Sequence, residues 1–458
     1  MFRSIANTFS NCFKIPELRS RIIFTMVALG FCRLIAFIRV PGLDGMALTH
    51  FFDLKREAGG SVLGMYSLFT GGALEHCAVG ALGIMPYISA TIIIQLLTAV
   101  IPQLSKLARE EGGRTKIIQY GRYLTVVLCL GQGMAMAIGW ERPEALFTGF
   151  QGRLVLYDSM WFYRLQTMLV LTTGTMLLMW IGEQITERGI GNGVSLVITI
   201  GILARLPAAI SGVRDMFFPG PNTVSQFNIG HAVALLLLLA GVIAGVIAVT
   251  QAQRKVPVQY AARAVGRKVY SGGTNYMPLR VNFAGVMPII FAQAILMFPQ
   301  KILLFLGSRF DVKFFREIAT SLNEGALLYM TLYGLMILFF SYFWVATQFN
   351  ELQIADDLKK NGGYIPGVRP GQATSDYLHN AMSRITLAGA VFLTIIALIP
   401  IILYREMQIQ YQVATFFGGT SMLIIVGVLL DTMRQVESHL LMRHYDGFLK
   451  KGKLRGRF

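Results

Sequence analysis

The stretch Gly83-Ile84-Met85-Pro86-Tyr87-Ile88 has a counterpart in the second half of the chain, Gly285-Val286-Met287-Pro288-Ile289-Ile290. A second pair of strings shares this property: Gly193-Val194-Ser195-Leu196-Val197-Ile198 and Gly419-Thr420-Ser421-Met422-Leu423-Ile424. The first pair lies in apolar segments two and seven, and the second pair in segments five and ten. Because each half then contains five segments, an odd number, the second half must insert upside down relative to the first. This is the arrangement of an inverted repeat.

The composition is that of a membrane protein. Hydrophobic residues make up 54% of the 458 residues and charged residues only 14%, and the mean hydropathy is +0.56. A soluble domain usually contains roughly 25% charged residues, and several apolar runs here approach the roughly 20 residues that span a bilayer. We predict an all-α polytopic membrane protein with ten transmembrane helices in two inverted five-helix halves around a central pore. The segments are 22–40, 78–101, 123–140, 160–181, 194–210, 232–249, 283–298, 326–346, 385–403 and 416–430.

These segments and the loops between them predict the organisation of the chain. The predicted parts are a cytoplasmic N-terminal segment 1–21, a first five-helix half 22–210 with a short half-helix at 61–72, a second five-helix half 211–436 with cytoplasmic docking loops at 251–280 and 348–379, and a basic cytoplasmic tail 437–458.

The distribution of Lys and Arg predicts the orientation. One alternate set of loops holds about twice as many of these residues as the other set, so both termini are expected in the cytoplasm. The net charge of +17 then belongs mostly to the cytoplasmic face, where it can meet anionic lipids or an acidic partner. We expect no cleavable signal peptide, because 1–14 contains no apolar core. Cys12, Cys32, Cys77 and Cys129 show no paired spacing, so a disulfide framework is not expected.

The sequence contains no motif for the usual enzymatic chemistries. It has no GxxxxGK[ST] phosphate loop, no HExxH metal motif and no GxSxG nucleophile motif. We therefore expect neither a catalytic site nor a cofactor or metal, and the energy for any transport must come from a partner, a gradient or the cargo. The middles of the segments that carry the repeat hold Ile, Val, Gly, Ser and Met instead of acidic groups, which disfavours an ion-coupled carrier. Arg33 is the main exception, and we expect it to snorkel or to pair structurally.

The repeated strings also suggest a ring of branched aliphatic side chains. Ile84 and Ile88 share one helix face, as do Val194 and Ile198, because each pair is four residues apart. A narrow apolar collar excludes ions by dewetting. Ordinary helix packing is the alternative for these residues. The predicted collar consists of Ile84, Ile88, Val194, Ile198, Ile290 and Ile424.

A short amphipathic stretch precedes the second segment. It is far too short to cross a membrane, and the Gly71-Gly72 pair separates it from the next helix. We interpret it as a movable stopper, or plug, and the alternative is an interfacial helix without motion. The plug residues are Ser61, Val62, Leu63, Gly64, Met65, Tyr66, Ser67, Leu68, Phe69, Thr70, Gly71 and Gly72.

Two long basic loops are predicted to dock a large partner. They are rich in Gly and Pro and are expected to form turns with displayed side chains. A purely topological role, as positive-inside loops, is the alternative.

The chain resembles the bacterial SecY family, whose members are the central subunit of the protein-conducting channel. The residues that carry the resemblance are Ser67 to Leu74, Ala81 to Ala90, Ile92 to Leu97, Gly182 to Gly193, Tyr364 to Gly371 and Phe417 to Ser421. The resemblance implies two halves hinged around a constriction at the same six collar residues, with the plug at Ser61 to Gly72. It implies a lateral gate with Gln95 and Asn282, and partner docking through Arg254, Lys255, Arg267, Lys268 and Arg369.

The resemblance also implies partners and a location. The expected partners are small membrane subunits of the SecE and SecG type, the SecA motor ATPase, a translating ribosome, signal sequences with their nascent polypeptides, and anionic lipids. The expected location is the bacterial cytoplasmic membrane, with unfolded polypeptides crossing the channel and apolar segments leaving sideways into lipid. The rival hypothesis is an inverted-repeat secondary transporter for a small solute, which would need a polar binding site in mid-membrane.

Overall fold

The computed structural model describes residues 15–56, 70–110, 112–143, 150, 152–217, 229–260, 263–265, 268–270, 273–310, 313–322, 326–407, 413 and 420–451. The chain forms two compact units. The first comprises Met1–Arg214 and Ile424–Phe458, and the second comprises Asp215–Leu423. The sequence predicts halves that divide at residue 210, with the last helix in the second half. In the structure, most of that helix belongs to the first unit.

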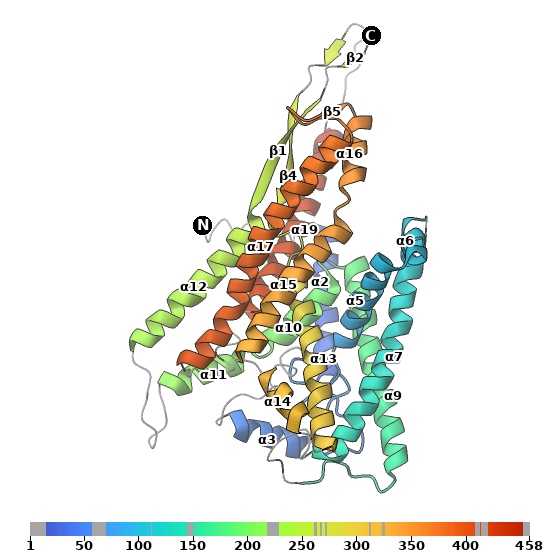
Figure 1. Cartoon of the computed structure of the whole chain (residues 1–458). Helices are drawn as coiled ribbons and strands as arrows, with labels where there is room; N and C mark the ends of the chain where they lie inside the picture. Colours follow the sequence, from blue (N-terminus) through green and yellow to red (C-terminus); the bar gives the residue numbers. More distant parts are fainter. Residues whose placement is uncertain are drawn as a thin grey trace. The chain divides into compact units, whose positions relative to one another are not determined.

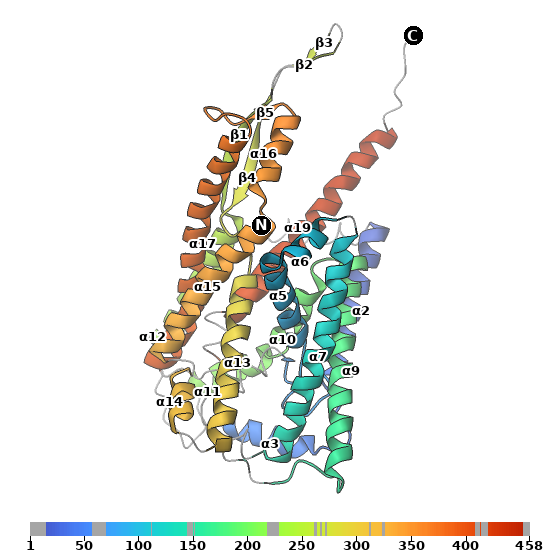
Figure 2. The same cartoon turned by 45° about the vertical axis from the view of Figure 1, so that its right-hand side comes forward.

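The first unit is built from helices (Figures 1 and 2). They are α2 (Pro16–Ile35), α3 (Gly45–Arg56), α5 (Met85–Val100), α6 (Pro102–Arg109), α7 (Gly113–Glu141), α9 (Met160–Arg188), α10 (Gly193–Leu203) and most of both α11 (Leu206–Phe217) and α19 (Thr420–Lys451).

The two Met-Pro strings of the repeat have the same local backbone. Gly83 has a φ of 61° and Gly285 has a φ of 63°, a region that only glycine enters without strain. Helix α5 begins at Met85 and α13 (Met287–Phe310) begins at Met287. The proline that follows each methionine is tolerated because the first turn of a helix needs no backbone donor there. Helix α5 thus starts seven residues after Ala78, the residue at which the predicted apolar segment begins.

Helices α7 and α9 lie side by side along their length (Figures 1 and 2). Ion pairs join them near both ends, Arg122 with Glu183 at 2.8 Å and Arg164 with Glu141 at 2.6 Å. Tyr163, next to Arg164, and Leu171, between the two pairs, are fully buried.

Helix α19 is tied to the first unit through the loop between α9 and α10. The backbone N–H of Gly191 donates to Oε1 of Gln435 at 2.7 Å, and that of Ile190 donates to Oγ1 of Thr25 at 3.1 Å. Ile190 also forms an apolar cluster with Leu18 of α2, against which Val436 and Leu440 of α19 pack. The loop thereby joins α2 and α19.

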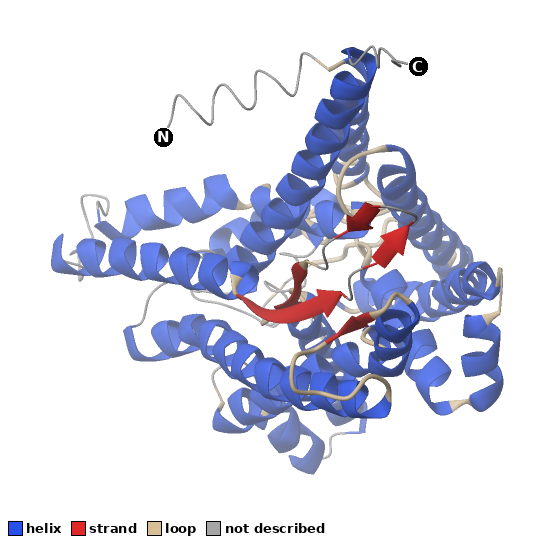
Figure 3. Cartoon of the chain, turned by 90° about the horizontal axis from the view of Figure 1, so that it is seen from above, coloured by secondary structure: helices blue, strands red, loops and turns tan. Residues whose placement is uncertain are grey.

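The second unit combines helices with a small sheet. Its helices are α12 (Ile229–Gln251), α13, α14 (Lys313–Ser321), α15 (Leu327–Gln348), α16 (Glu351–Lys360) and α17 (Gln372–Met407), and its strands are β1 (Gln253–Tyr260), β2 (Arg263–Val265), β3 (Lys268–Tyr270), β4 (Thr274–Arg280) and β5 (Gly363–Tyr364). The five described strands all belong to this unit (Figure 3).

The predicted docking loops contain regular structure rather than only turns. β1 pairs antiparallel with β4 over Gln253–Gln259, and its end pairs with β5, so that the strand order is β4-β1-β5. Val256 and Val258 alternate with exposed or half-buried residues and are buried against α15 and α17. This period of two buries one face of the ladder, and it is the signal that the prediction of turns overlooked.

Several helices are suited to a membrane. Within the described residues, six helices are long and apolar enough to cross one, or seven if the bent pair α5–α6, with its 105° kink, is one span. α12 is the most apolar of them, and Leu236 and Leu237 are 65% and 70% exposed on it. Exposed leucines at this density are expected to face lipid. The count of ten spans is consistent with these helices and stays a prediction.

The close packing of α10 on α9 gives a testable prediction. A Cβ at Gly193 would lie 1.8 Å from the carbonyl oxygen of Gly182, so Gly193→Ala must separate two backbones. We expect this substitution to destabilise the protein by about 1–3 kcal/mol, measured as a lower thermal unfolding midpoint in detergent. Gly131→Ala is the matched control, because a Cβ at Gly131 in α7 meets nothing within 4 Å. An equal effect of both substitutions would contradict the packing argument.

Candidate functional site

Two predicted collar residues lie where α5 begins. Ile84 is the N-cap residue of α5, and the N–H of Ile88 donates to its carbonyl oxygen at 3.2 Å. Both side chains are buried, with 3% and 4% of their surface exposed. Ile84 and Ile88 are thus one helical turn apart, as their spacing in the sequence predicts.

Two more collar residues lie in the first half of α10. Asn192 caps this helix by accepting a hydrogen bond from the N–H of Ser195 at 3.2 Å. Val194 is half-buried and Ile198 is buried. The cap and the contact between Gly193 and Gly182 fix the start of α10, and therefore the position of Val194, against α9.

The remaining two collar residues come from later helices. Ile290 lies in the first turn of α13, in the second unit. Ile424 lies near the start of α19 and is the residue at which the chain re-enters the first unit. Both are buried. Five of the six predicted collar residues therefore belong to one unit. The ring that would join all six stays a prediction.

The predicted plug falls mainly outside the described residues, which include only Thr70, Gly71 and Gly72 of it. Gly71 and Gly72 have φ values of 64° and 91°, and they open a series of tight turns that runs to Ile84. A side chain at Gly71 would also meet Gly201 of α10, whose Cα lies 3.0 Å from the ideal Cβ position. The glycines are thus required both by conformation and by space.

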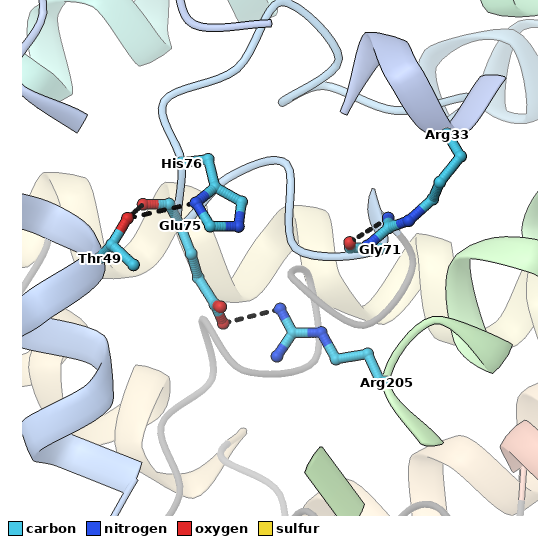
Figure 4. A network of polar contacts seen from close by, with 6 residues as sticks. All are labelled: Arg33, Thr49, Gly71, Glu75, His76 and Arg205. Carbon is cyan, nitrogen blue, oxygen red and sulfur yellow. Dashed lines mark hydrogen bonds and ion pairs between the residues drawn. The ribbon is translucent and has the colours of Figure 1, made fainter. Parts of the chain in front are cut away.

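A polar network holds these turns, as Figure 4 shows. Arg33 of α2 donates to the carbonyl oxygen of Gly71, which is the structural pairing expected for that residue. Glu75 forms an ion pair with Arg205, with Oε1 and Nη2 2.7 Å apart and both side chains largely buried. Nδ1 of His76 lies 3.2 Å from Oγ1 of Thr49 in α3. Three helical regions are thereby joined to one short segment.

The imidazole of this network is expected to be neutral at pH 7. Burial lowers the pKa of His76, an effect opposed by the Glu75 carboxylate and reinforced by Arg39, Arg205 and Arg33. The contact between His76 and Thr49 is therefore a neutral hydrogen bond rather than a charged one.

The predicted lateral-gate residues lie on separate units. Gln95 is half-buried on α5, and Asn282 is buried just before α13. Each is a polar side chain near a helix that carries a collar residue. Their role at a gate stays a prediction.

The two predicted docking loops join in one scaffold within the second unit. Gln259 of β1 pairs with Tyr364 of β5, and the hydroxyl of Tyr364 lies 3.0 Å from Oε1 of Gln259. Arg254 and Lys255 are exposed on β1, and Arg369 is exposed beyond β5. Lys268 lies in β3, while Arg267 is outside the described residues. The scaffold displays basic side chains from both loops.

Sequence reasoning did not identify Glu75, Arg205, Thr25 or Gln435. A charge inside or beside an apolar segment is a signal for the first two, since such a group needs a partner. Thr25 and Gln435 carry no comparable signal, because single polar residues occur in most of these helices. In the described part of the chain, no three His, Cys, Asp or Glu side chains come close enough to hold a metal ion.

The chain matches known proteins over nearly its whole length. A sequence model of the SecY family matches residues 78–433. The chain is 42% identical over 456 residues to the "Protein translocase subunit SecY" of Chlamydia trachomatis serovar D, covering 98% of this chain and 99% of that protein. It is also 42% identical to the subunit of the same name from Escherichia coli K12, covering 96% of each.

Solved structures show the same fold at low sequence identity. One described as "The structure of a protein conducting channel" aligns with a TM-score of 0.60 at 16% identity, covering 91% of each chain. "Sec61 in the Canine ribosome-channel complex from the endoplasmic reticulum" aligns with a TM-score of 0.56. These alignments confirm the predicted class, a helical multi-pass membrane fold. Together with the full-length relatives, they show that this chain belongs to the SecY family.

Proposed function

We propose that this chain is the channel subunit through which unfolded secretory polypeptides cross the bacterial cytoplasmic membrane and from which transmembrane segments pass sideways into lipid. The observation that carries the proposal is the 42% identity, over 98% of this chain, to a protein named as a translocase subunit. The function is that of a channel and not of an enzyme. Both termini are proposed to lie in the cytoplasm, in keeping with the basic loops.

The proposed barrier is the aliphatic collar. Ile84, Ile88 and Ile198 are buried near helix starts that glycines and caps fix in place. Branched aliphatic side chains offer no ligand to an ion, and a narrow apolar constriction dewets. The same side chains can pack around an extended peptide of any sequence. The collar can therefore hold back ions without selecting among polypeptides.

The proposed opening step uses hydrophobic free energy. A signal sequence that moves into lipid gains about 0.8 kcal/mol per buried CH₂. This energy would open the proposed lateral gate, to which Gln95 and Asn282 are assigned, and displace the plug, 61–72. The polypeptide would then enter the collar, and apolar segments would leave through the same gate.

The energy for transport is proposed to come from partners that dock on the basic scaffold. The candidates are a SecA-type motor ATPase and a translating ribosome. The canine channel whose fold this chain shares was solved in a ribosome-channel complex, which supports the second candidate. Small SecE- and SecG-type subunits are proposed to brace the helices, and anionic lipids to neutralise the cytoplasmic charge.

The solute-transporter hypothesis receives no support. The full-length relatives are named as translocase subunits, and the fold neighbours include a protein-conducting channel.

If the collar closes the channel, a polar substitution in it should let precursors with defective signal sequences through. Ile88→Asn places an amide in the buried apolar ring and stabilises water there, so the closed state is weakened. We expect export of a precursor with a defective signal sequence to rise by about ten-fold, measured in cells by the fraction of precursor processed. Ile23→Asn is the control, because Ile23 is 45% exposed on α2. Unchanged export with Ile88→Asn would contradict the collar role of this residue.

If the basic scaffold docks the motor, reversing one of its charges should weaken motor-driven export. Arg369→Glu reverses an exposed charge on the loop after β5, so motor-driven export in proteoliposomes should fall by about ten-fold or more. Membrane insertion of the channel itself should not change. Arg214→Glu makes the same charge change at an exposed position of α11 outside the scaffold and should have little effect. Full export by the Arg369 variant would count against docking at this loop.

A further inference from the structure

We propose that Glu75 and Arg205 are positioning residues for the collar, and that their ion pair sets how strictly the channel demands a functional signal sequence. This inference rests on the proposed function and deepens it. It assigns a role to two charged residues that neither the collar nor the docking scaffold includes.

The segment that carries Glu75 behaves as one piece with the first collar residues. Between Thr70 and Ile84 the backbone is held by its own turns, including Glu75 N to Gly72 O at 3.1 Å and Ala78 N to Ala73 O at 2.9 Å. Ala73, Leu74, Cys77, Ala78 and Ala81 are fully buried. A dense, internally bonded segment transmits displacement instead of absorbing it. A force on Glu75 therefore reaches Ile84 and the start of α5.

The residue that carries the other charge is joined as directly to the second collar pair. Arg205 follows α10 after the single residue Ala204, and its N–H donates to the carbonyl oxygen of Ile202 at 3.0 Å. α10 comprises only Gly193–Leu203 and carries Val194 and Ile198. The ion pair therefore links the segment that leads into Ile84 and Ile88 with the helix that presents Val194 and Ile198.

Two further contacts mark this junction. The backbone of Gly71 lies so close to Gly201 of α10 that a Cβ at Gly71 would be only 3.0 Å from the Cα of Gly201. Arg33 donates to the Gly71 carbonyl oxygen from α2. The junction thus combines a close backbone contact with an ion pair and a charged hydrogen bond, all within the first unit. Figure 4 shows the ion pair and the hydrogen bond.

The chemistry of the pair favours a role beyond packing. The side chains of Arg205 and Glu75 are 11% and 6% exposed, so both charges have lost most of their hydration. Apolar side chains of similar size often hold such a contact as well or better. Breaking the pair leaves a buried charge that must regain water. Water drawn to the junction would then also hydrate the neighbouring collar, which must stay dry to exclude ions. Removing one partner of this pair is therefore costly, because it leaves the other charge buried without a counter-ion.

The experiment compares signal stringency in variants of this pair. The readout is the ratio of export of a signal-defective precursor to export of the intact precursor, at equal amounts of channel in the membrane, and a higher ratio means lower stringency. Glu75→Gln should raise this ratio by about ten-fold. The charge-swapped variant E75R/R205E should return it toward the wild-type value. Glu183→Gln, which breaks the Arg122–Glu183 pair on the α7–α9 seam, should leave it unchanged.

The outcomes separate this inference from the proposed function. A wild-type ratio in Glu75→Gln, or an equal rise in Glu183→Gln, overturns the positioning role while channel activity stands. If the wild-type channel exports no precursor at all, the proposed function fails. Should Glu75→Gln not accumulate, Glu75→Asp keeps the charge with a shorter reach. An increased ratio in that variant supports the role, and an unchanged ratio overturns it.

Discussion

The left-handed backbone at the glycine of each Met-Pro string is the constraint on which α5 and α13, two of the helices that carry predicted collar residues, depend. Gly83 and Gly285 turn the chain at φ values of 61° and 63°, and only after this turn can a helix begin at the following methionine. A residue with a Cβ would be strained at both positions. The start of the helix, in turn, decides where Ile84, Ile88 and Ile290 lie. One backbone requirement therefore fixes three of the predicted collar positions.

Apolar patterning made the helical membrane class and the paired strings visible in the sequence, because both depend on local composition. The β1–β4 ladder was not predicted, since its buried valines Val256 and Val258 stand in a short stretch dominated by basic and polar residues. The partnership of Glu75 with Arg205 joins residues 130 apart, and no periodicity relates them. Such pairs follow from the tertiary fold. The hydrogen bond from Gly191 to Gln435 was hidden for the same reason.

Charge is managed differently in the two units. In the first unit, Arg33, Glu75, Arg122 and Arg164 lie in or beside apolar helices, and each has a charged or carbonyl partner. Unpaired charge would be costly in these surroundings. In the second unit, Arg254 and Arg369 are exposed on the sheet scaffold, where they keep their hydration and carry no desolvation cost. The first pattern stabilises a fold, and the second leaves charge available to a partner.

Two helices connect the units, and one of them carries a predicted collar residue. The first crossing occurs inside α11, between Arg214 and Asp215, and this helix begins directly after Arg205. The return crossing occurs inside α19, between Leu423 and Ile424, and Ile424 is itself a predicted collar residue. A continuous helix transmits a rotation better than a loop does, because its backbone hydrogen bonds resist bending. Helix α19 contains Ile424, and α11 begins eight residues after Ile198. Under the proposed function, these two helices are therefore the covalent routes by which docking on the second unit would reach the predicted collar residues of the first.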